Sequence, residues 1–129
     1  MKKVLNFFMI LILACFTVVK AEALTFEEAF SRVDSKPMVV LVYAQWADNY
    51  QSVLQNFRLV KNQLSESYNF VELDIASNDA KSFNSRYEIY RNLPYVLMFR
   101  NGGKVSRYVS RDCASSTSCM SSKLKSFIQ

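Results

Sequence analysis

The sequence RNLPYVLMFRNGG occupies residues 91–103 and places one proline directly before an apolar run that ends in a glycine turn. The run Tyr95–Arg100 is apolar except for its last residue, and its aromatic and branched side chains favour a β-strand. The Asn101-Gly102-Gly103 sequence that follows suits a tight turn, because Asn and Gly tolerate the positive φ angles of hairpin turns. We therefore expect a second strand over residues 105–110, antiparallel to the first.

Two further strands are expected upstream of this proline. Residues 38–44 form a near-continuous apolar run rich in β-branched side chains, which is typical of a central strand covered on both faces. Residues 70–75 have the composition of another strand. Because a helical pattern separates these two runs, they are expected to pair in parallel as a βαβ unit.

Four helices are expected around the strands. A capping box at residues 25–28 begins a short first helix. Asp48 is the expected N-cap of a second helix, whose apolar residues recur at helical spacing over residues 53–64. A third helix is expected over residues 77–87, and a fourth presents apolar side chains along residues 120–128.

The composition excludes several kinds of chemistry. The 129-residue chain has no histidine, so it has no imidazole to activate a nucleophile or to bind zinc. Its two glycines are adjacent, which rules out a GxGxxG loop or a P-loop. Lys and Arg outnumber Asp and Glu by 16 to 11 but are scattered along the chain, so no nucleic-acid partner is expected. No cofactor or metal is expected either.

Three segments resemble the thioredoxin family: KPMVVLVYAQW at residues 36–46, FVELDI at residues 70–75, and RNLPYVLMFRNGG at residues 91–103. The first is similar to the thioredoxin strand that ends in Ala-x-Trp, and the third resembles the family's cis-proline loop and hairpin. The resemblance implies an α/β three-layer sandwich, whose mixed central sheet combines a parallel βαβ unit with an antiparallel C-terminal hairpin. It also implies that the Leu93–Pro94 peptide bond is cis.

The sequence departs from this family at the redox motif. Active thioredoxins carry Cys-x-x-Cys directly after the tryptophan, whereas the residues after Trp46 read ADNY. Ala47 and Tyr50 stand at the two cysteine positions, and the buried acid that assists proton transfer in active members falls on Leu41. A thiolate is the attacking group of disulfide exchange. The sequence therefore predicts no oxidoreductase activity at the usual site.

The resemblance also implies a peptide-binding surface, and this surface needs no cysteine. In thioredoxins the backbone before the cis-proline pairs with an extended substrate strand, a small case of β-augmentation. The corresponding residues here are Trp46, Ala47, Asp48, Asn49, Tyr50, Leu93 and Pro94. Trp46 and Tyr50 are the expected aromatic anchors. The alternative is that Asp48 only caps the helix while both aromatic side chains pack locally.

Residues 1–23 have the pattern of a signal peptide, which leaves residues 24–129 as one thioredoxin-like domain. Two lysines precede an apolar stretch, and Ala21 and Ala23 give the small-x-small spacing that a signal peptidase cleaves. We therefore expect an exported protein, periplasmic or secreted. The alternatives are an uncleaved N-terminal membrane anchor and lipid attachment at Cys15, and only these would bring the chain to a membrane.

Export would place Cys113 and Cys119 in an oxidising compartment, where paired thiols usually form a disulfide. A structural cross-link is favoured, because five intervening residues differ from the two-residue spacing of redox motifs. The alternative is a relocated redox pair, with Cys119 near the start of the last helix.

These observations predict an exported, redox-inactive protein that binds a peptide or protein partner through the former substrate groove, in an adaptor, chaperone-like or assembly role. An atypical thiol–disulfide oxidoreductase that uses Cys113 and Cys119 is the alternative, and a purely structural subunit is a third hypothesis.

Overall fold

The structure is a computed structural model, and it describes residues 24–128. The signal peptide predicted at residues 1–23, with Cys15, lies outside the described residues, as does Gln129.

Four strands form one mixed sheet in the order β2-β1-β3-β4. The strands are β1 (Met38–Tyr43), β2 (Asn69–Asp74), β3 (Tyr95–Arg100) and β4 (Lys104–Val109). The β1–β2 pair is parallel, and the β1–β3 and β3–β4 pairs are antiparallel. This topology confirms the predicted combination of a βαβ unit with a C-terminal hairpin.

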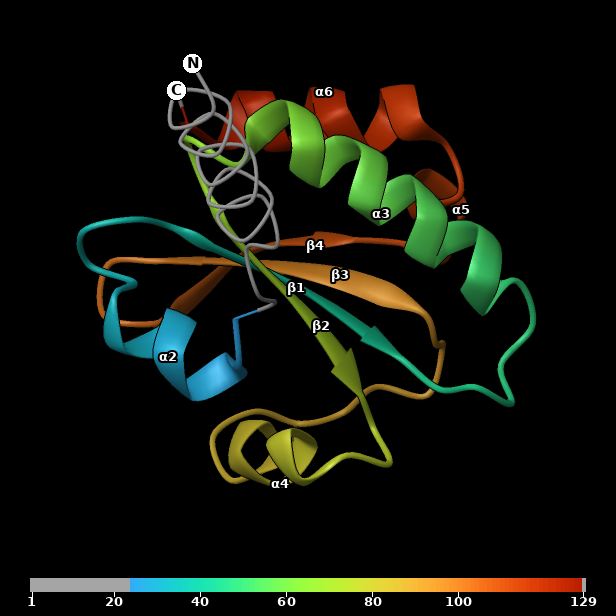
Figure 1. The fold of residues 1–129 in the computed structure, drawn as a ribbon, viewed down its shortest axis with the longest axis horizontal. Helices are drawn as coiled ribbons and strands as arrows, with labels where there is room; N and C mark the ends of the chain where they lie inside the picture. The colour runs from blue at the N-terminus through green and yellow to red at the C-terminus, as the bar shows by residue number, and fades with distance from the viewer. Residues whose placement is uncertain (1–23, 129) are drawn as a thin grey trace, which may run out of the picture.

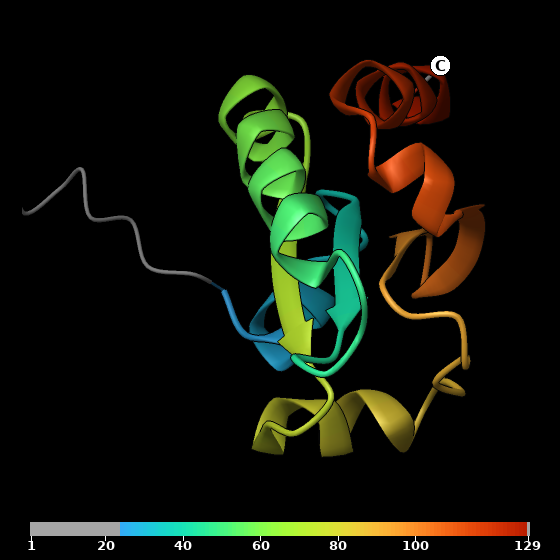
Figure 2. The ribbon, with the colours of Figure 1, turned by 90° about the vertical axis from the view of Figure 1, so that its right-hand side faces the viewer.

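Five helices accompany the sheet within the described residues. They are α2 (Phe26–Ser31), α3 (Tyr50–Leu64), α4 (Asn78–Asn84), α5 (Arg111–Ala114) and α6 (Thr117–Ile128). Helices α2 and α4 lie on one side of the sheet, and α3 and α6 lie on the other (Figure 1, Figure 2). Two buried apolar clusters fill the spaces between these layers, one on each face. The predicted three-layer α/β sandwich is confirmed.

In the second half of the chain, the helices differ from the sequence-based prediction at two places. The capping box at Thr25 and Glu28 is present and begins α2 as expected, and Ser77 caps α4. However, α4 ends at Asn84 rather than near Tyr87. Helix α5 was not predicted, because its single turn is too short to show apolar periodicity.

The hairpin between β3 and β4 has the predicted turn, and Gly103 has two separate reasons to be glycine. Its φ is +79°, in the left-handed region that disfavours side chains. In addition, a Cβ on Gly103 would lie 2.5 Å from Cε2 of Phe30. The Tyr87 hydroxyl donates a hydrogen bond to the Gly103 carbonyl, which fixes the turn against the α2 side of the sheet.

We predict that Gly103→Ala lowers the free energy of unfolding by about 2–3 kcal/mol, since it adds a clash with Phe30 to the backbone penalty. Gly102→Ala is the matched control. Its φ is +78°, but its added Cβ meets nothing within 4 Å, so a loss of about 1 kcal/mol is expected. Urea unfolding followed by circular dichroism measures both variants, and equal losses would contradict the proposed clash.

Tyr68, which directly precedes β2, ties the βαβ unit to the last helix. Its side chain is 1% exposed, and its hydroxyl donates a hydrogen bond to the Leu124 carbonyl in α6. Burial raises the pKa of Tyr68 to about 12, against the opposing effect of the positive charges of Arg100 and Arg107. The folded protein therefore keeps the Tyr68 phenol protonated at pH values well above the ordinary tyrosine pKa of 10.

Stability should fall between pH 10 and about 12, because the unfolded chain loses the Tyr68 proton in this window while the folded chain keeps it. Tyr68→Phe should reduce this alkaline loss, although Tyr95, whose pKa burial also raises to about 12, continues to contribute. At pH 7 the same variant should lose about 1 kcal/mol with the hydrogen bond. Urea unfolding of wild type and Tyr68→Phe at pH 7 and between pH 10 and 12 measures both effects. The same alkaline loss of stability in the two proteins would refute the prediction.

Candidate functional site

The loop between β1 and α3 carries four of the seven residues predicted to bind peptide, and a fifth, Tyr50, is the first residue of α3. A hydrogen bond of 3.0 Å from the Ala47 N–H to the Ala44 carbonyl closes a tight turn. This turn buries Ala47, which is 8% exposed, and projects Trp46 into solvent with 73% of its surface exposed. Trp46 therefore does not pack locally, which was the alternative for this residue.

The α3 helix begins one residue later than the sequence predicted. Its N-cap is Asn49 rather than Asp48, and the Asn49 side chain makes no capping hydrogen bond. Asn49 has a φ of +65°, a left-handed conformation that asparagine tolerates better than most residues. The Asp48 side chain is exposed and has no helix-capping role.

Tyr50, in contrast, packs against a neighbour. Its ring stacks on that of Tyr43 at the end of β1, with centroids 5.9 Å apart and an interplanar angle of 3°. Burial, followed by the negative charges of Asp74 and Glu72, raises the pKa of Tyr43. One face of the Tyr50 ring is thus occupied by Tyr43, in agreement with the alternative of local packing for this residue.

The loop before β3 contains the remaining two predicted residues. The Leu93–Pro94 bond is cis, as expected, and both residues are buried. The Leu93 N–H donates to the Arg91 carbonyl at 2.9 Å. The Tyr90 N–H donates to the Tyr95 hydroxyl at 3.0 Å and fixes the loop to the start of β3.

The sheet register brings the two loops together. Val42, near the end of β1, is paired with Tyr95, the first residue of β3, so both loops leave the sheet at the same end (Figure 1). Ala47 and Leu93 are buried in the same apolar cluster. Residues 45–52 line an open hollow of about 460 Å³ at this end. The register therefore places the two candidate loops at the same end of the sheet, with the hollow lined by the first loop and the first turn of α3.

Neither candidate loop contains a cysteine, so neither carries a thiol. Ala47 and Tyr50 occupy the positions at which the family carries cysteines, and Leu41 is fully buried among the apolar residues beneath α3. The other feature of the family's site, the cis-proline, is present.

Cys113 and Cys119 form a disulfide elsewhere, between α5 and α6, with their Cα atoms 5.3 Å apart. Asn56 of α3 supports the same connection, because its amide nitrogen donates to the Ser115 carbonyl at 2.8 Å and its amide oxygen accepts from Thr117 at 3.1 Å. Both sulfur-bearing residues are partly exposed.

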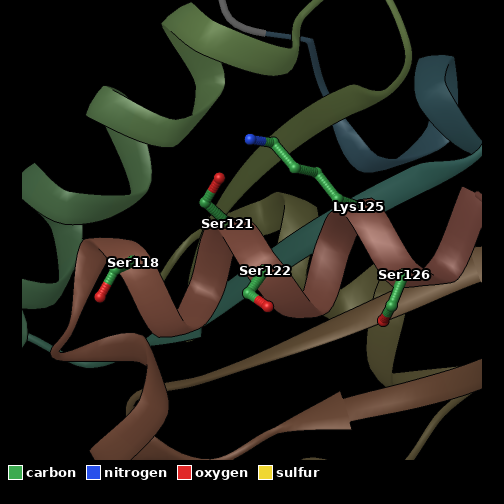
Figure 3. A pocket seen from close by; sticks show the side chains of 5 residues that line it. All are labelled: Ser118, Ser121, Ser122, Lys125 and Ser126. Carbon is green, nitrogen blue, oxygen red and sulfur yellow. The ribbon is translucent and has the colours of Figure 1, made fainter.

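A second open hollow, of about 470 Å³, lies along α6 and was not predicted. The residues that line it are Ser118, Ser121, Ser122, Lys125 and Ser126. Ser121 and Lys125 extend from the same side of the helix, and Ser122 points away from them (Figure 3). The small serine side chains account for the hollow, since they leave the helix surface uncovered.

Residues 24–128 contain no group of three His, Cys, Asp or Glu side chains that could hold a metal ion. In the same part of the chain, no helix has both the length and the apolar character needed to cross a membrane.

The fold, with the cis Leu93–Pro94 loop and the β1–α3 loop at the same end of the sheet, defines a thioredoxin-fold protein. The comparison with family models agrees. The thioredoxin family model matches residues 17–124. The chain therefore belongs to the thioredoxin family. A comparison with curated proteins finds no match.

Solved structures of thioredoxins share the fold at low sequence identity. A chain in the complex of ferredoxin:thioredoxin reductase with thioredoxin f2 is 16% identical, with a TM-score of 0.64, and the match covers 81% of this chain and 88% of that one. The germline-specific thioredoxin Deadhead of Drosophila melanogaster is 15% identical, with a TM-score of 0.61 and coverages of 82% and 97%. Fasciola hepatica thioredoxin is 16% identical, with a TM-score of 0.57 and coverages of 79% and 86%.

Proposed function

We propose that this chain is an exported, redox-inactive member of the thioredoxin family that binds an extended peptide or protein segment through the Trp46 loop and the Leu93–Pro94 loop. The observation that carries the proposal is Trp46, a large aromatic side chain held 73% exposed by a loop whose neighbouring alanine is buried. Exposed aromatic side chains beside a hollow are typical anchors of binding surfaces.

The loss of chemistry at this loop supports a binding role over a catalytic one. Neither Ala47 nor Tyr50 can supply a nucleophile for disulfide exchange. The surrounding architecture is nevertheless intact: the turn that projects Trp46, the cis peptide bond and the register that joins the two loops. A surface kept in shape without its reactive groups fits recognition.

The backbone of the cis-proline loop limits how a peptide can pair with it. Because the Leu93 N–H already donates to the Arg91 carbonyl, the Leu93 carbonyl is the group left to accept a hydrogen bond from a peptide N–H. We therefore propose a single backbone contact at Leu93, with side-chain contacts to Trp46 and to the exposed part of Tyr50 supplying the rest of the affinity.

Trp46→Ala should weaken peptide binding by about tenfold or more, as expected for the loss of an aromatic anchor. The measurement is binding of the purified protein to an immobilised library of extended peptides, followed by dissociation constants for the peptides retained. Thermal unfolding should change little, because the indole is mostly in solvent.

Leu59→Ala is the matched control for this experiment. Leu59 is also an exposed apolar side chain, at 53%, but it lies in the middle of α3. The Leu59→Ala variant should bind the retained peptides as the wild type does. Equal binding by wild type, Trp46→Ala and Leu59→Ala would reject the Trp46 surface.

Thiol–disulfide exchange at Cys113 and Cys119 is the second candidate function. The observation in its favour is that Cys119 lies in the first turn of α6, where the helix dipole stabilises a thiolate. In such a reaction a partner dithiol would attack the disulfide, release Cys119 as the thiolate, and be oxidised as the pair is reduced.

The Cys113→Ser/Cys119→Ser variant separates the two functions. As a structural cross-link, the disulfide contributes about 2 kcal/mol to stability by closing a short loop. We expect the variant to lose that stability, while wild type and variant both fail to reduce insulin above background. Insulin reduction by the wild type that disappears in the variant would establish the redox function instead.

A further inference from the structure

Positive charge is concentrated in the C-terminal part of the fold. Ten of the eleven Asp and Glu residues lie before residue 89, and residues 89–111 contain five Arg or Lys and no acidic residue. Those residues form the cis-proline loop, β3 and β4. Two of these five cations, Lys104 and Arg107, stand on β4, which is an end strand of the sheet.

The outer side of β4 is an unpaired strand edge. Among residues 24–128, β4 pairs with β3 on one side and with no strand on the other. A bulge interrupts the β3–β4 register between Arg107 and Val105, and pairing is regular from Arg107 to Val109. This regular stretch has backbone groups directed outward, where an added strand could bind.

One side of this edge is basic. Arg107 is exposed and is paired with Met98, so it lies on the α6 side of the sheet. Lys123 is also exposed, and it lies one helical turn after Cys119, on the side of α6 that is bonded to α5 just beyond β4. Within the described part of the chain, neither cation forms an ion pair.

The other side of the edge is aromatic. Tyr108 is 43% exposed and is paired with Leu97, which places it on the α2 side of the sheet. Its ring lies 5.9 Å from that of Tyr90, which is 41% exposed, and 5.6 Å from that of Tyr95. Two tyrosines thus form an exposed aromatic patch supported by a third, buried one.

We propose that the outer edge of β4 binds an extended acidic peptide, in which acidic and apolar residues alternate. A strand added here would direct alternate side chains to opposite faces of the sheet. One set would meet Arg107 and Lys123, and the other would meet Tyr90 and Tyr108. This surface is separate from the Trp46 loop, and it can function whether or not that loop binds peptide.

The test uses a fluorescein-labelled eight-residue peptide of alternating Glu and Val, with fluorescence anisotropy as the measurement. Binding should weaken as salt rises. Arg107→Gln/Lys123→Gln should weaken it about tenfold. The control variant Arg32→Gln/Lys81→Gln also removes two positive charges, from exposed positions elsewhere. It should leave binding within about twofold of wild type, because it changes only the net charge.

Two further measurements test the strand geometry. Tyr108→Thr, which removes the ring but keeps a residue that favours β-strands at this position, should weaken binding about fivefold. A peptide methylated on the alternate backbone nitrogens that face β4 should lose binding, because it cannot pair. A peptide methylated on the intervening nitrogens, which face away from β4, should still bind. Equal binding by both methylated peptides would overturn strand addition.

Other anionic ligands provide the last comparison. A single-stranded oligodeoxynucleotide of equal charge and vesicles of phosphatidylglycerol should bind more weakly than the peptide. Tighter binding of either, reduced by Arg107→Gln/Lys123→Gln, would overturn the peptide assignment. Absence of peptide binding in the wild type would mean that the charges only protect the edge from aggregation, and would also overturn it. A Trp46→Ala protein should bind this peptide unchanged.

Discussion

The antiparallel pairing of β1 with β3 is the constraint on which the rest of this structure depends. Strand β1 is buried from Met38 to Val42 and pairs with β2 on its other side. Its register with β3 sets Val42 opposite Tyr95, so the loop that follows β1 and the loop that precedes β3 must leave the sheet together. A shift of one residue would exchange the side chains between the two apolar clusters, which explains why the site geometry is as firmly fixed as the core.

The chain has the cis-proline loop of the thioredoxin fold but no cysteine at positions 47 and 50. An alanine in place of a cysteine fits easily where Ala47 is buried, and Leu41 belongs naturally to the apolar layer beneath α3. Neither residue disturbs the turn that projects Trp46 or the cis-proline loop beside it. Because the scaffold is held by backbone register and apolar packing, its shape does not depend on cysteines at positions 47 and 50.

Local signals made much of the fold predictable. The capping box at Thr25, the glycine turn after Arg100 and the apolar run of β1 each specify their conformation within a few residues. The left-handed N-cap at Asn49 was missed because asparagine and aspartate are about equally favoured at an N-cap, so the sequence does not distinguish Asn49 from Asp48. The basic and aromatic sides of β4 could not be predicted at all, since they depend on which residues the hairpin register places on each face.

Trp46 is the only tryptophan in the chain, and it stands in the candidate binding loop rather than in the core. Indole emission from this protein therefore originates at one site, in contrast to the many proteins whose tryptophans report mainly on the integrity of the interior. The wavelength of maximum emission reports on the solvent exposure of this one loop. It responds little to the packing of the two apolar clusters. The chain thus carries an intrinsic fluorescent probe in the loop that we propose to bind peptide.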